Sequence, residues 1–324
     1  MGFTLSVISV AWISNTIFGM PLMISILLGA IIGGTSSPIV FPLVSELSNV
    51  KKEACLILKM ESVITDPMAI IVSLVLIETI TISPMDGLMV QELVTSLMSM
   101  LSISFMVGFF SGIIWGNIWH KFTRYRYHYM LTIGFLFFIY VITEFVGGSG
   151  AISAFMVGLV LGNMPSIKKM FKIKHTLAGL TKETRDFNSY IAFFVRTFFF
   201  ALIGMMLTFS NTELILYGIL ISIILLGVRG FFVRICTYKL NISDREKNIM
   251  TFMYPRGLAA AVLASLPFIE YGIPGTQVFT EIVFTVIITT VLISTFGVSI
   301  IEKKNKIKKK INEVKKQAPE TKDV

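Results

Sequence analysis

Long apolar stretches run along almost the whole chain, and short polar segments separate them. Each stretch is close to the length that a helix needs to cross a hydrocarbon core of roughly 30 Å. We place about ten of them at residues 3–18, 21–47, 54–79, 93–118, 128–146, 149–164, 188–209, 213–237, 248–270 and 277–301. The pattern therefore predicts an all-α polytopic membrane protein of about ten transmembrane helices.

The composition agrees with a membrane setting. Hydrophobic residues make up 54% of the 324 residues and charged residues 15%, and the mean hydropathy is +0.80. A soluble domain of this size would need more polar surface. The net charge of +9 could suggest nucleic acid as a partner. However, the basic residues lie in loops and in the C-terminal tail, so we interpret them as topology signals and expect no nucleic acid.

The basic residues also predict the orientation. Lys and Arg follow the second, fourth, sixth and eighth apolar segments, whereas the intervening loops TISPMDGLMVQE, FVGG, SNTE and EYGIPGTQVFTE contain neither. Cytoplasmic loops carry the excess of Lys and Arg in membrane proteins. We therefore expect a multi-pass protein of the cell membrane with both termini in the cytoplasm.

Two carboxylates, Glu61 and Asp66, lie well inside an apolar segment, in the stretch KMESVITDPMAIIVSLVLIE. A charge at the centre of a bilayer costs roughly 3 kcal/mol on insertion scales, so such residues indicate function or pairing. For Glu61 a structural ion pair between helices is a sufficient explanation. Asp66 has Ser62 one helical turn before it and Thr65 beside it, and these oxygens suit a small cation. Because burial disfavours a bare charge, Asp66 could hold a proton or a cation, but rarely both.

Glycine and proline interrupt two apolar segments. The first interruption is in GAIIGGTSSPIVFPLV, where we expect Gly33, Gly34, Pro38 and Pro42 to break the helix. The second is in FMYPRGLAAAVLASLP, at Pro255, Arg256 and Gly257. Paired broken helices in separate parts of a chain are typical of inverted-repeat transporters, which bind ions near the breaks. Carbonyl and hydroxyl oxygens of residues 35–37 would add ligands there.

These motifs, in this order, resemble the monovalent cation:proton antiporter superfamily, the sodium/proton exchangers, and most closely its prokaryotic members. The segment GGTSSPIVFPLVSEL is similar to the broken helix of that family, and MESVITDP is similar to the Glu-Ser-x-x-Asn-Asp signature of the electroneutral branch. The later segments GGSGAISAFMVGLVLGN, FFVRTFFFALIGMML, LLGVRGFFVRI and YPRGLAAAVLA match in order and spacing, so the resemblance covers residues 1–301. It implies an inverted-repeat fold in which a core of crossed broken helices moves against a scaffold domain.

The resemblance also implies roles for individual residues. Asp66 would alternately bind the cation and the proton, and Na⁺ is the first candidate for the cation. The accessory ligands of the cation would be Ser62, Thr65 and the main chain of Thr35. The structural ion pair would come from Glu61, Arg229 and Arg256. Glu61 would be the structural acid, with Arg229 as the first candidate for its partner and Arg256 as the second. Alternatively, Arg256 would stabilise helix ends at the second break.

The chain departs from the family pattern in two ways. Thr65 stands where the electroneutral branch has Asn and the electrogenic branch has a second aspartate. With one titrating carboxylate, exchange of one proton for one monovalent cation would be electroneutral. In addition, family members carry about two or three further helices before the point where this sequence starts. We therefore expect an N-terminally short chain with an incomplete first repeat.

The resemblance divides the chain into four regions. Residues 1–164 would hold the remainder of the N-terminal repeat and the following helices, including the broken helix 21–47 and the ion-site helix 54–79. Residues 165–187 would form a cytoplasmic interfacial linker helix. Residues 188–301 would form the C-terminal repeat with the broken helix 248–270, and residues 302–324 a basic cytoplasmic tail.

The expected function is secondary active exchange of Na⁺ for H⁺ within a lipid bilayer. K⁺ or Li⁺ as the cation, transport of an organic anion with sodium, and a truncated, non-transporting membrane subunit stay open as alternatives. An enzyme is not expected, because the chain shows no protease motif and its three His residues lie in loops. No cofactor is expected. A homodimer is a candidate assembly, although the sequence does not fix the oligomeric state.

Overall fold

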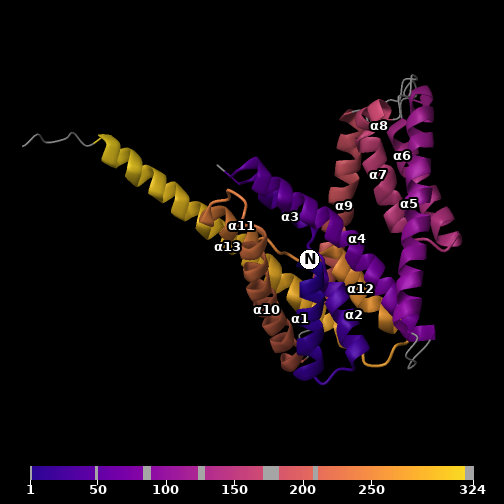
Figure 1. Ribbon diagram of the computed structural model, residues 1–324, viewed down its shortest axis with the longest axis horizontal. Helices are drawn as coiled ribbons and strands as arrows, with labels where there is room; N and C mark the ends of the chain where they lie inside the picture. The colour runs from indigo at the N-terminus through magenta and orange to yellow at the C-terminus, as the bar shows by residue number, and fades with distance from the viewer. Residues whose placement is uncertain are drawn as a thin grey trace, which may run out of the picture. The chain divides into compact units, whose positions relative to one another are not determined.

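The computed structural model describes residues 2–47, 50–82, 89–122, 128–170, 182–206 and 211–317. Every regular element within these ranges is a helix, which confirms the all-α prediction (Figure 1). The helices are α1 (Gly2–Thr16), α2 (Leu22–Gly33), α3 (Ser37–Ser45), α4 (Lys52–Ile82), α5 (Met89–Phe122), α6 (His128–Phe145), α7 (Gly150–Gly162), α8 (Met164–Met170), α9 (Lys182–Met206), α10 (Thr212–Cys236), α11 (Asp244–Phe252), α12 (Leu258–Ile269) and α13 (Phe279–Gln317).

The ten predicted segments all coincide with helices, and the two expected to be broken are each divided in two, as α2/α3 and α11/α12. One detail of the prediction is wrong: Pro42 does not interrupt its helix, because α3 runs through it to Ser45. Five helical stretches of the described chain are long and apolar enough to cross a membrane: Leu22–Ser45, Lys52–Thr81, Met98–Ile118, Thr212–Cys236 and Phe279–Lys304. The chain is thus a polytopic membrane protein, and the figure of about ten crossings stays a prediction.

The linker and the tail are described in part. The predicted linker helix, residues 165–187, overlaps α8 and the start of α9, and residues 171–181 lie outside the described ranges. The tail does not begin a new element, because α13 continues from the last apolar segment to Gln317. With a rise of 1.5 Å per residue, a helix of 39 residues is far longer than a hydrocarbon core of about 30 Å. Its basic C-terminal part therefore extends beyond the apolar span.

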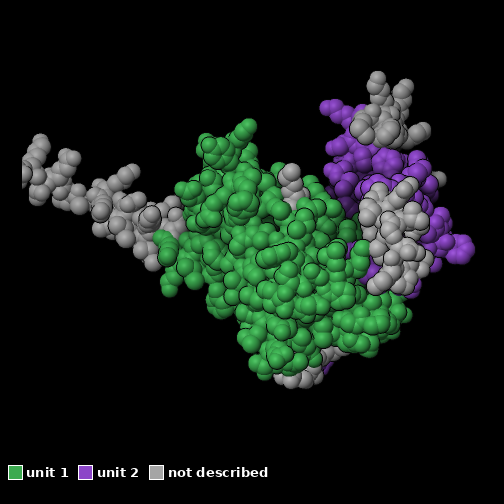
Figure 2. Space-filling model, turned by 60° about the horizontal axis from the view of Figure 1, so that its bottom comes forward, with its two compact units in different colours: residues 1–73, 206–324 green, residues 74–205 purple. Residues whose placement is uncertain are grey.

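The chain forms two compact units, coloured separately in Figure 2. Unit 1 contains residues 1–73 and 206–324, and unit 2 contains residues 74–205. The boundary after Ser73 lies inside the continuous helix α4. This division groups residues by packing, whereas the four predicted regions group them by repeat, so the repeat boundaries stay a prediction.

Unit 1 brings both broken helices together. Helix α1 packs against α2 and α10, α10 packs against α11 and α13, and α12 packs against α2 and α13. The contact of α1 with α2 requires a glycine at Gly29, because a Cβ atom there would lie 2.6 Å from the carbonyl oxygen of Val7. A cluster of buried aliphatic side chains from α3, α4, α10, α11 and α13 holds one end of the unit together. The two breaks are therefore held inside one packed body.

Beside that cluster, the buried carboxylate of Glu246 joins the start of α4 to the start of α11. Its Oε1 accepts the backbone N–H of Lys51 at 2.7 Å, and its Oε2 accepts the backbone N–H and the hydroxyl of Ser243 at 2.9 and 2.8 Å. Ser243 and Glu246 form a capping box on α11, and the Lys51 ammonium donates to the carbonyl of Asn241. One carboxylate thus satisfies backbone donors of two helices at once.

Unit 2 contains a tight contact between α5 and α7. Gly108, Gly112 and Gly116 are spaced four residues apart on α5, so they lie on one face. A Cβ atom on Gly108 would lie 2.6 Å from the carbonyl oxygen of Ser153, and one on Gly112 would lie 2.8 Å from the Cβ of Val160. Small residues at such positions let membrane helices approach closely, where packing holds them together.

Replacing Gly108 by alanine should therefore destabilise unit 2. The added methyl group meets backbone atoms of α7, and overpacking of this kind costs about 1–3 kcal/mol. The measurement is the unfolding midpoint in detergent. Gly158→Ala is the matched control, because a Cβ atom at Gly158 meets no heavy atom within 4 Å. Equal midpoints for the two variants would contradict the close approach.

Glu246 should make the stability of the protein depend on pH in acid. Burial raises the pKa of Glu246, but the backbone N–H groups of Lys51 and Ser243 and the Ser243 hydroxyl outweigh it and hold the pKa below its ordinary value. The stabilisation is therefore fully present above the unfolded-state pKa of about 4.3 and is lost as pH falls through the lower folded-state pKa. We expect Glu246→Gln to lower the unfolding midpoint at pH 7 and to lose stability less steeply in acid than the parent. An identical acid dependence would contradict this role.

Candidate functional site

The first break separates α2 from α3 by three extended residues. Gly34 ends α2 with φ −77° and ψ 148°, and Ser36 begins α3 with φ −73° and ψ 109°. Pro38 lies in the first turn of α3, where its missing N–H removes no helical hydrogen bond. At Gly34 a Cβ atom would lie 2.8 Å from the carbonyl oxygen of Thr65, so only glycine allows α4 to pass this closely.

Asp66 caps the N-terminus of α3 from the neighbouring helix. Its Oδ2 accepts the backbone N–H of Ser37 at 3.1 Å. Ser36 stands at the N-cap position, but among the described residues its side chain caps nothing and its buried hydroxyl has no hydrogen-bond partner. A helix N-terminus carries a partial positive charge, which favours a carboxylate at this place. The half-helix α3 therefore stabilises the charged form of Asp66.

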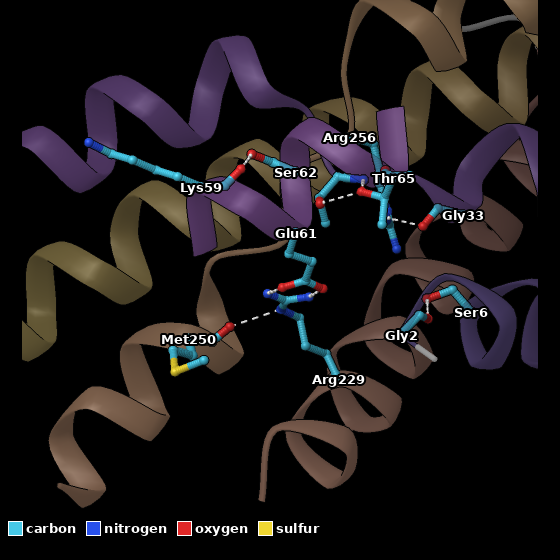
Figure 3. Close-up of polar contacts among 12 residues, drawn as sticks. Gly2, Ser6, Gly33, Lys59, Glu61, Ser62, Thr65, Arg229, Met250 and Arg256 are labelled. Carbon is cyan, nitrogen blue, oxygen red and sulfur yellow. Dashed lines mark hydrogen bonds and ion pairs between the residues drawn. The ribbon is translucent and has the colours of Figure 1, made fainter. Parts of the chain in front are cut away.

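Arg256 binds the opposite end of the same break. At the C-terminus of α2, its Nη1 donates to the carbonyl oxygen of Gly33 at 2.8 Å (Figure 3). The same Nη1 donates to the carbonyl oxygen of Gly34 at 2.5 Å. A helix C-terminus carries a partial negative charge, so a buried guanidinium is favourable there. Arg256 itself is 3% exposed and comes from residues 253–257, the second break.

The two breaks touch where they cross. The backbone N–H of Ser36 donates to the carbonyl oxygen of Pro255 at 2.8 Å. Gly257 faces Ser36 so closely that a Cβ atom on it would lie 2.1 Å from the Ser36 hydroxyl oxygen. The crossing therefore uses backbone groups of both non-helical segments, and a glycine makes it sterically feasible.

Hydroxyl groups connect the first break to α4. The Thr65 hydroxyl accepts the backbone N–H of Thr35 at 3.1 Å and lies 2.9 Å from the Thr35 hydroxyl. Ser62 is buried one turn earlier, and its hydroxyl donates to the carbonyl oxygen of Lys59 at 2.9 Å. Because that hydroxyl donates its hydrogen within its own helix, its oxygen lone pairs stay available to accept a hydrogen bond or to coordinate a cation.

Glu61 and Arg229 form a bidentate ion pair. Arg229 Nη1 lies 2.7 Å from Glu61 Oε1, and Arg229 Nη2 lies 2.9 Å from Glu61 Oε2. The Nε of Arg229 donates to the carbonyl oxygen of Met250 at 2.8 Å, so the pair joins α4, α10 and α11 (Figure 3). The side chains of Arg229 and Glu61 are 8% and 20% exposed, so the pair is largely withdrawn from solvent.

A small cavity of about 10 Å³ lies beside this pair. Glu61, Arg229, Thr35, Thr65 and Arg256 contribute to its lining. The volume is close to the smallest space that holds one water molecule, and the polar lining suits one. Asp66 is not among the lining residues, so the cavity belongs to the ion pair and not to the Asp66 carboxylate.

The structure places the residues selected from the sequence in unit 1 and brings five of them into contact in two groups, while the hydroxyl of Ser62 bonds its own helix. Thr35, Thr65 and Asp66 meet at the first break, while Glu61 and Arg229 pair beside it. The second candidate for that pairing, Arg256, binds helix ends instead. Sequence reasoning missed three contacts: the Ser37 N–H on Asp66, the Pro255 carbonyl at the crossing, and the Thr290 hydroxyl, which accepts the Arg256 N–H at 3.1 Å. Two of these are backbone groups, for which the sequence carries no signal.

A double-mutant cycle tests the ion pair. Arg229→Met alone should lower the free energy of unfolding by about 3 kcal/mol or more, because it leaves the Glu61 charge unpaired. Adding Glu61→Leu should recover most of that loss, since an apolar replacement of both partners leaves no such charge. The cycle is measured by chemical unfolding in detergent. A double variant as unstable as the sum of the single variants would contradict energetic coupling of the pair.

Comparisons with known proteins agree with this architecture. A family model described as the transmembrane sodium/hydrogen exchanger matches residues 1–304. The solved structure of the sodium proton antiporter MjNhaP1 from Methanocaldococcus jannaschii at pH 8 is similar with a TM-score of 0.69 and 21% identity, over 93% of this chain and 74% of that one. This likeness supports the fold.

Two curated proteins are also similar. The Na(+)/H(+) antiporter ApNhaP of Aphanothece halophytica is 28% identical over 87% of this chain and 54% of its own length. The K(+)/H(+) antiporter NhaP2 of Shewanella sp. (strain ANA-3) is 26% identical over 78% of this chain and 42% of its own length. The chain therefore spans about half the length of the curated relatives that it matches. Since the family model covers nearly all of it, the chain belongs to the transmembrane sodium/hydrogen exchanger family.

Proposed function

We propose that this protein exchanges a monovalent cation for a proton across a membrane, and that Asp66 carries either ion. One observation carries the proposal. The Asp66 carboxylate lies in an apolar span and is bonded to the break of a neighbouring helix, with the hydroxyls of Thr35 and Thr65 at the same break. Family membership adds independent support.

The site would work by competition at one carboxylate. The ionised Asp66 accepts one N–H from α3 and keeps lone pairs for a further ligand. A cation would take those lone pairs together with neighbouring oxygens, for which Ser62, Thr65 and the Thr35 main chain are the candidates. A proton on the same carboxylate removes its negative charge and with it the attraction for a cation. Each ion therefore displaces the other.

The other charged side chains beside the first break support an electroneutral stoichiometry. Glu61 and Arg229 neutralise each other as a pair, and Arg256 is compensated by the carbonyl end of α2. Among the described residues at the first break, this leaves Asp66 as the carboxylate that would change its ligand during the cycle. One proton for one monovalent cation moves no net charge, so we expect a membrane potential without ion gradients to drive no exchange.

The remaining roles follow from the same geometry. The Glu61–Arg229 pair would be structural, holding α4 against α10 and α11. Na⁺ is the first candidate for the cation and K⁺ the alternative, because the similar curated proteins are named as antiporters of one or the other. The termini would be cytoplasmic on the evidence of the basic loops. A homodimer within the lipid bilayer is the proposed assembly.

Removing the carboxylate charge should abolish exchange. In proteoliposomes that contain a pH-sensitive dye, the parent protein should alkalinise an acidic lumen when Na⁺, K⁺ or Li⁺ is added outside. Asp66→Asn should show no response above that of empty vesicles, because an amide neither releases a proton nor neutralises a cation. Glu78→Gln is the matched control, since it removes an exposed carboxylate from the same helix.

Two outcomes would overturn the proposal. Undiminished exchange in Asp66→Asn would remove Asp66 from the role of carrier. A parent protein that inserts and folds but exchanges none of the three cations would instead favour a non-transporting membrane subunit.

A further inference from the structure

Residues 253–257 form a buried non-helical segment between α11 and α12. The N–H groups of Met253 and Tyr254 donate to the nearby carbonyl oxygens of Ile249 and Phe252, whereas the N–H of Arg256 is bonded outside its own segment. A buried backbone donor without a partner is costly, and each must be satisfied from elsewhere. The N–H of Arg256 finds its acceptor on α13, where the hydroxyl oxygen of Thr290 lies 3.1 Å away. This hydrogen bond fixes the main chain at the residue whose side chain reaches the first break.

Thr290 is suited to this task. It is fully buried, and its hydroxyl donates to the carbonyl oxygen of Val286 at 2.7 Å within its own helix. The hydroxyl hydrogen is therefore engaged, and the oxygen faces Arg256 as an acceptor. Thr285, on the same helix, also donates to its own helix, to the carbonyl of Glu281 at 2.9 Å. Thr285 thus provides the same chemistry without the contact to the break.

The guanidinium of Arg256 depends on such support. Its Nη1 binds two carbonyl oxygens at the end of α2, whereas its Nε is buried with no hydrogen-bond partner among the described residues. Among the described residues, the Arg256 guanidinium forms no ion pair with a carboxylate. Its position is therefore set by these two hydrogen bonds and by where its main chain is held.

We propose that Thr290 is a positioning residue for the ion site, acting through Arg256 on the first break. The inference deepens the proposed function and rests on it for its effect on transport. Thr290 holds the Arg256 main chain, and Arg256 holds Gly33 and Gly34. Next to these residues, Thr35 and Ser37 donate their N–H groups to Thr65 and Asp66.

A second hydrogen bond holds the second break when the Thr290 hydroxyl is removed. The hydroxyl of the buried Tyr254 donates to the carbonyl oxygen of Ser222 on α10 at 3.2 Å. Removing the Thr290 hydroxyl should therefore loosen the break locally and leave the helices in place.

Backbone hydrogen–deuterium exchange in detergent tests the structural link without any need for transport. Thr290→Val, which keeps the shape and removes the hydroxyl, should speed exchange about tenfold in peptides that cover residues 253–257, as expected for one lost hydrogen bond. Exchange at residues 34–37 should also rise. Thr285→Val is the matched control and should change neither peptide, and Thr290→Ser, which keeps the hydroxyl, should resemble the parent.

Exchange of ions in proteoliposomes tests the consequence for the site. Thr290→Val should raise the KM for the cation severalfold and change kcat less, because the ligands at the first break are held less firmly. Thr290→Ser should restore the parent KM. A purely structural role would reduce the amount of folded protein and leave the KM unchanged.

Several outcomes would overturn the inference. One is unchanged deuterium exchange at residues 34–37 in Thr290→Val, and another is a Thr290→Ser variant that behaves like Thr290→Val. A third, provided that the parent transports, is a Thr290→Val variant with the parent KM. If Thr290→Val fails to fold, comparing Thr290→Ala with Thr290→Ser isolates the hydroxyl. A parent that exchanges no ions would refute the proposed function, and deuterium exchange would then decide the link between the two breaks by itself.

Discussion

The interruption of one membrane helix at residues 34–36 creates two opposite partial charges, and the proposed ion site is arranged around them. Arg256 compensates the carbonyl end of α2, and Asp66 compensates the amide end of α3. In water these ends would be solvated, but in hydrocarbon each uncompensated group costs several kcal/mol. Asp66 is therefore both a cap and the proposed carrier, so a change of its ligand also changes how well α3 is capped.

Helix α4 supplies most of the side chains around this break, and its spacing explains how. Glu61 and Thr65 are four residues apart, as are Ser62 and Asp66, so each pair lies on one face. On the first face, Glu61 pairs with Arg229 and Thr65 bonds Thr35. On the second face, Asp66 accepts the N–H of Ser37. Glu246 fixes the start of the same helix. A single long helix can thus hold a charge pair and the proposed carrier in fixed register.

The second break binds the first break and helps to hold it in place. Its carbonyl at Pro255 and its guanidinium at Arg256 both bind the first break, while Thr290 and Tyr254 hold it to α13 and α10. Unwound backbone at membrane depth is tolerated where protein surrounds it, and here the two unwound segments satisfy each other in part. This mutual dependence explains why the breaks come as a pair.

Hydropathy, Gly and Pro positions and intramembrane charges determined much of this protein by themselves: the helical fold, both breaks, and Glu61 and Asp66 as candidates. These signals are local, because burial in lipid forces helix formation wherever the backbone can bond to itself. Pro42 shows the limit of such signals, since packing of Val40 and Val44 into the core holds α3 together around it. Only the tertiary structure decided which arginine pairs with Glu61 and which backbone groups meet Asp66, because those partners are distant in sequence and depend on how the helices cross.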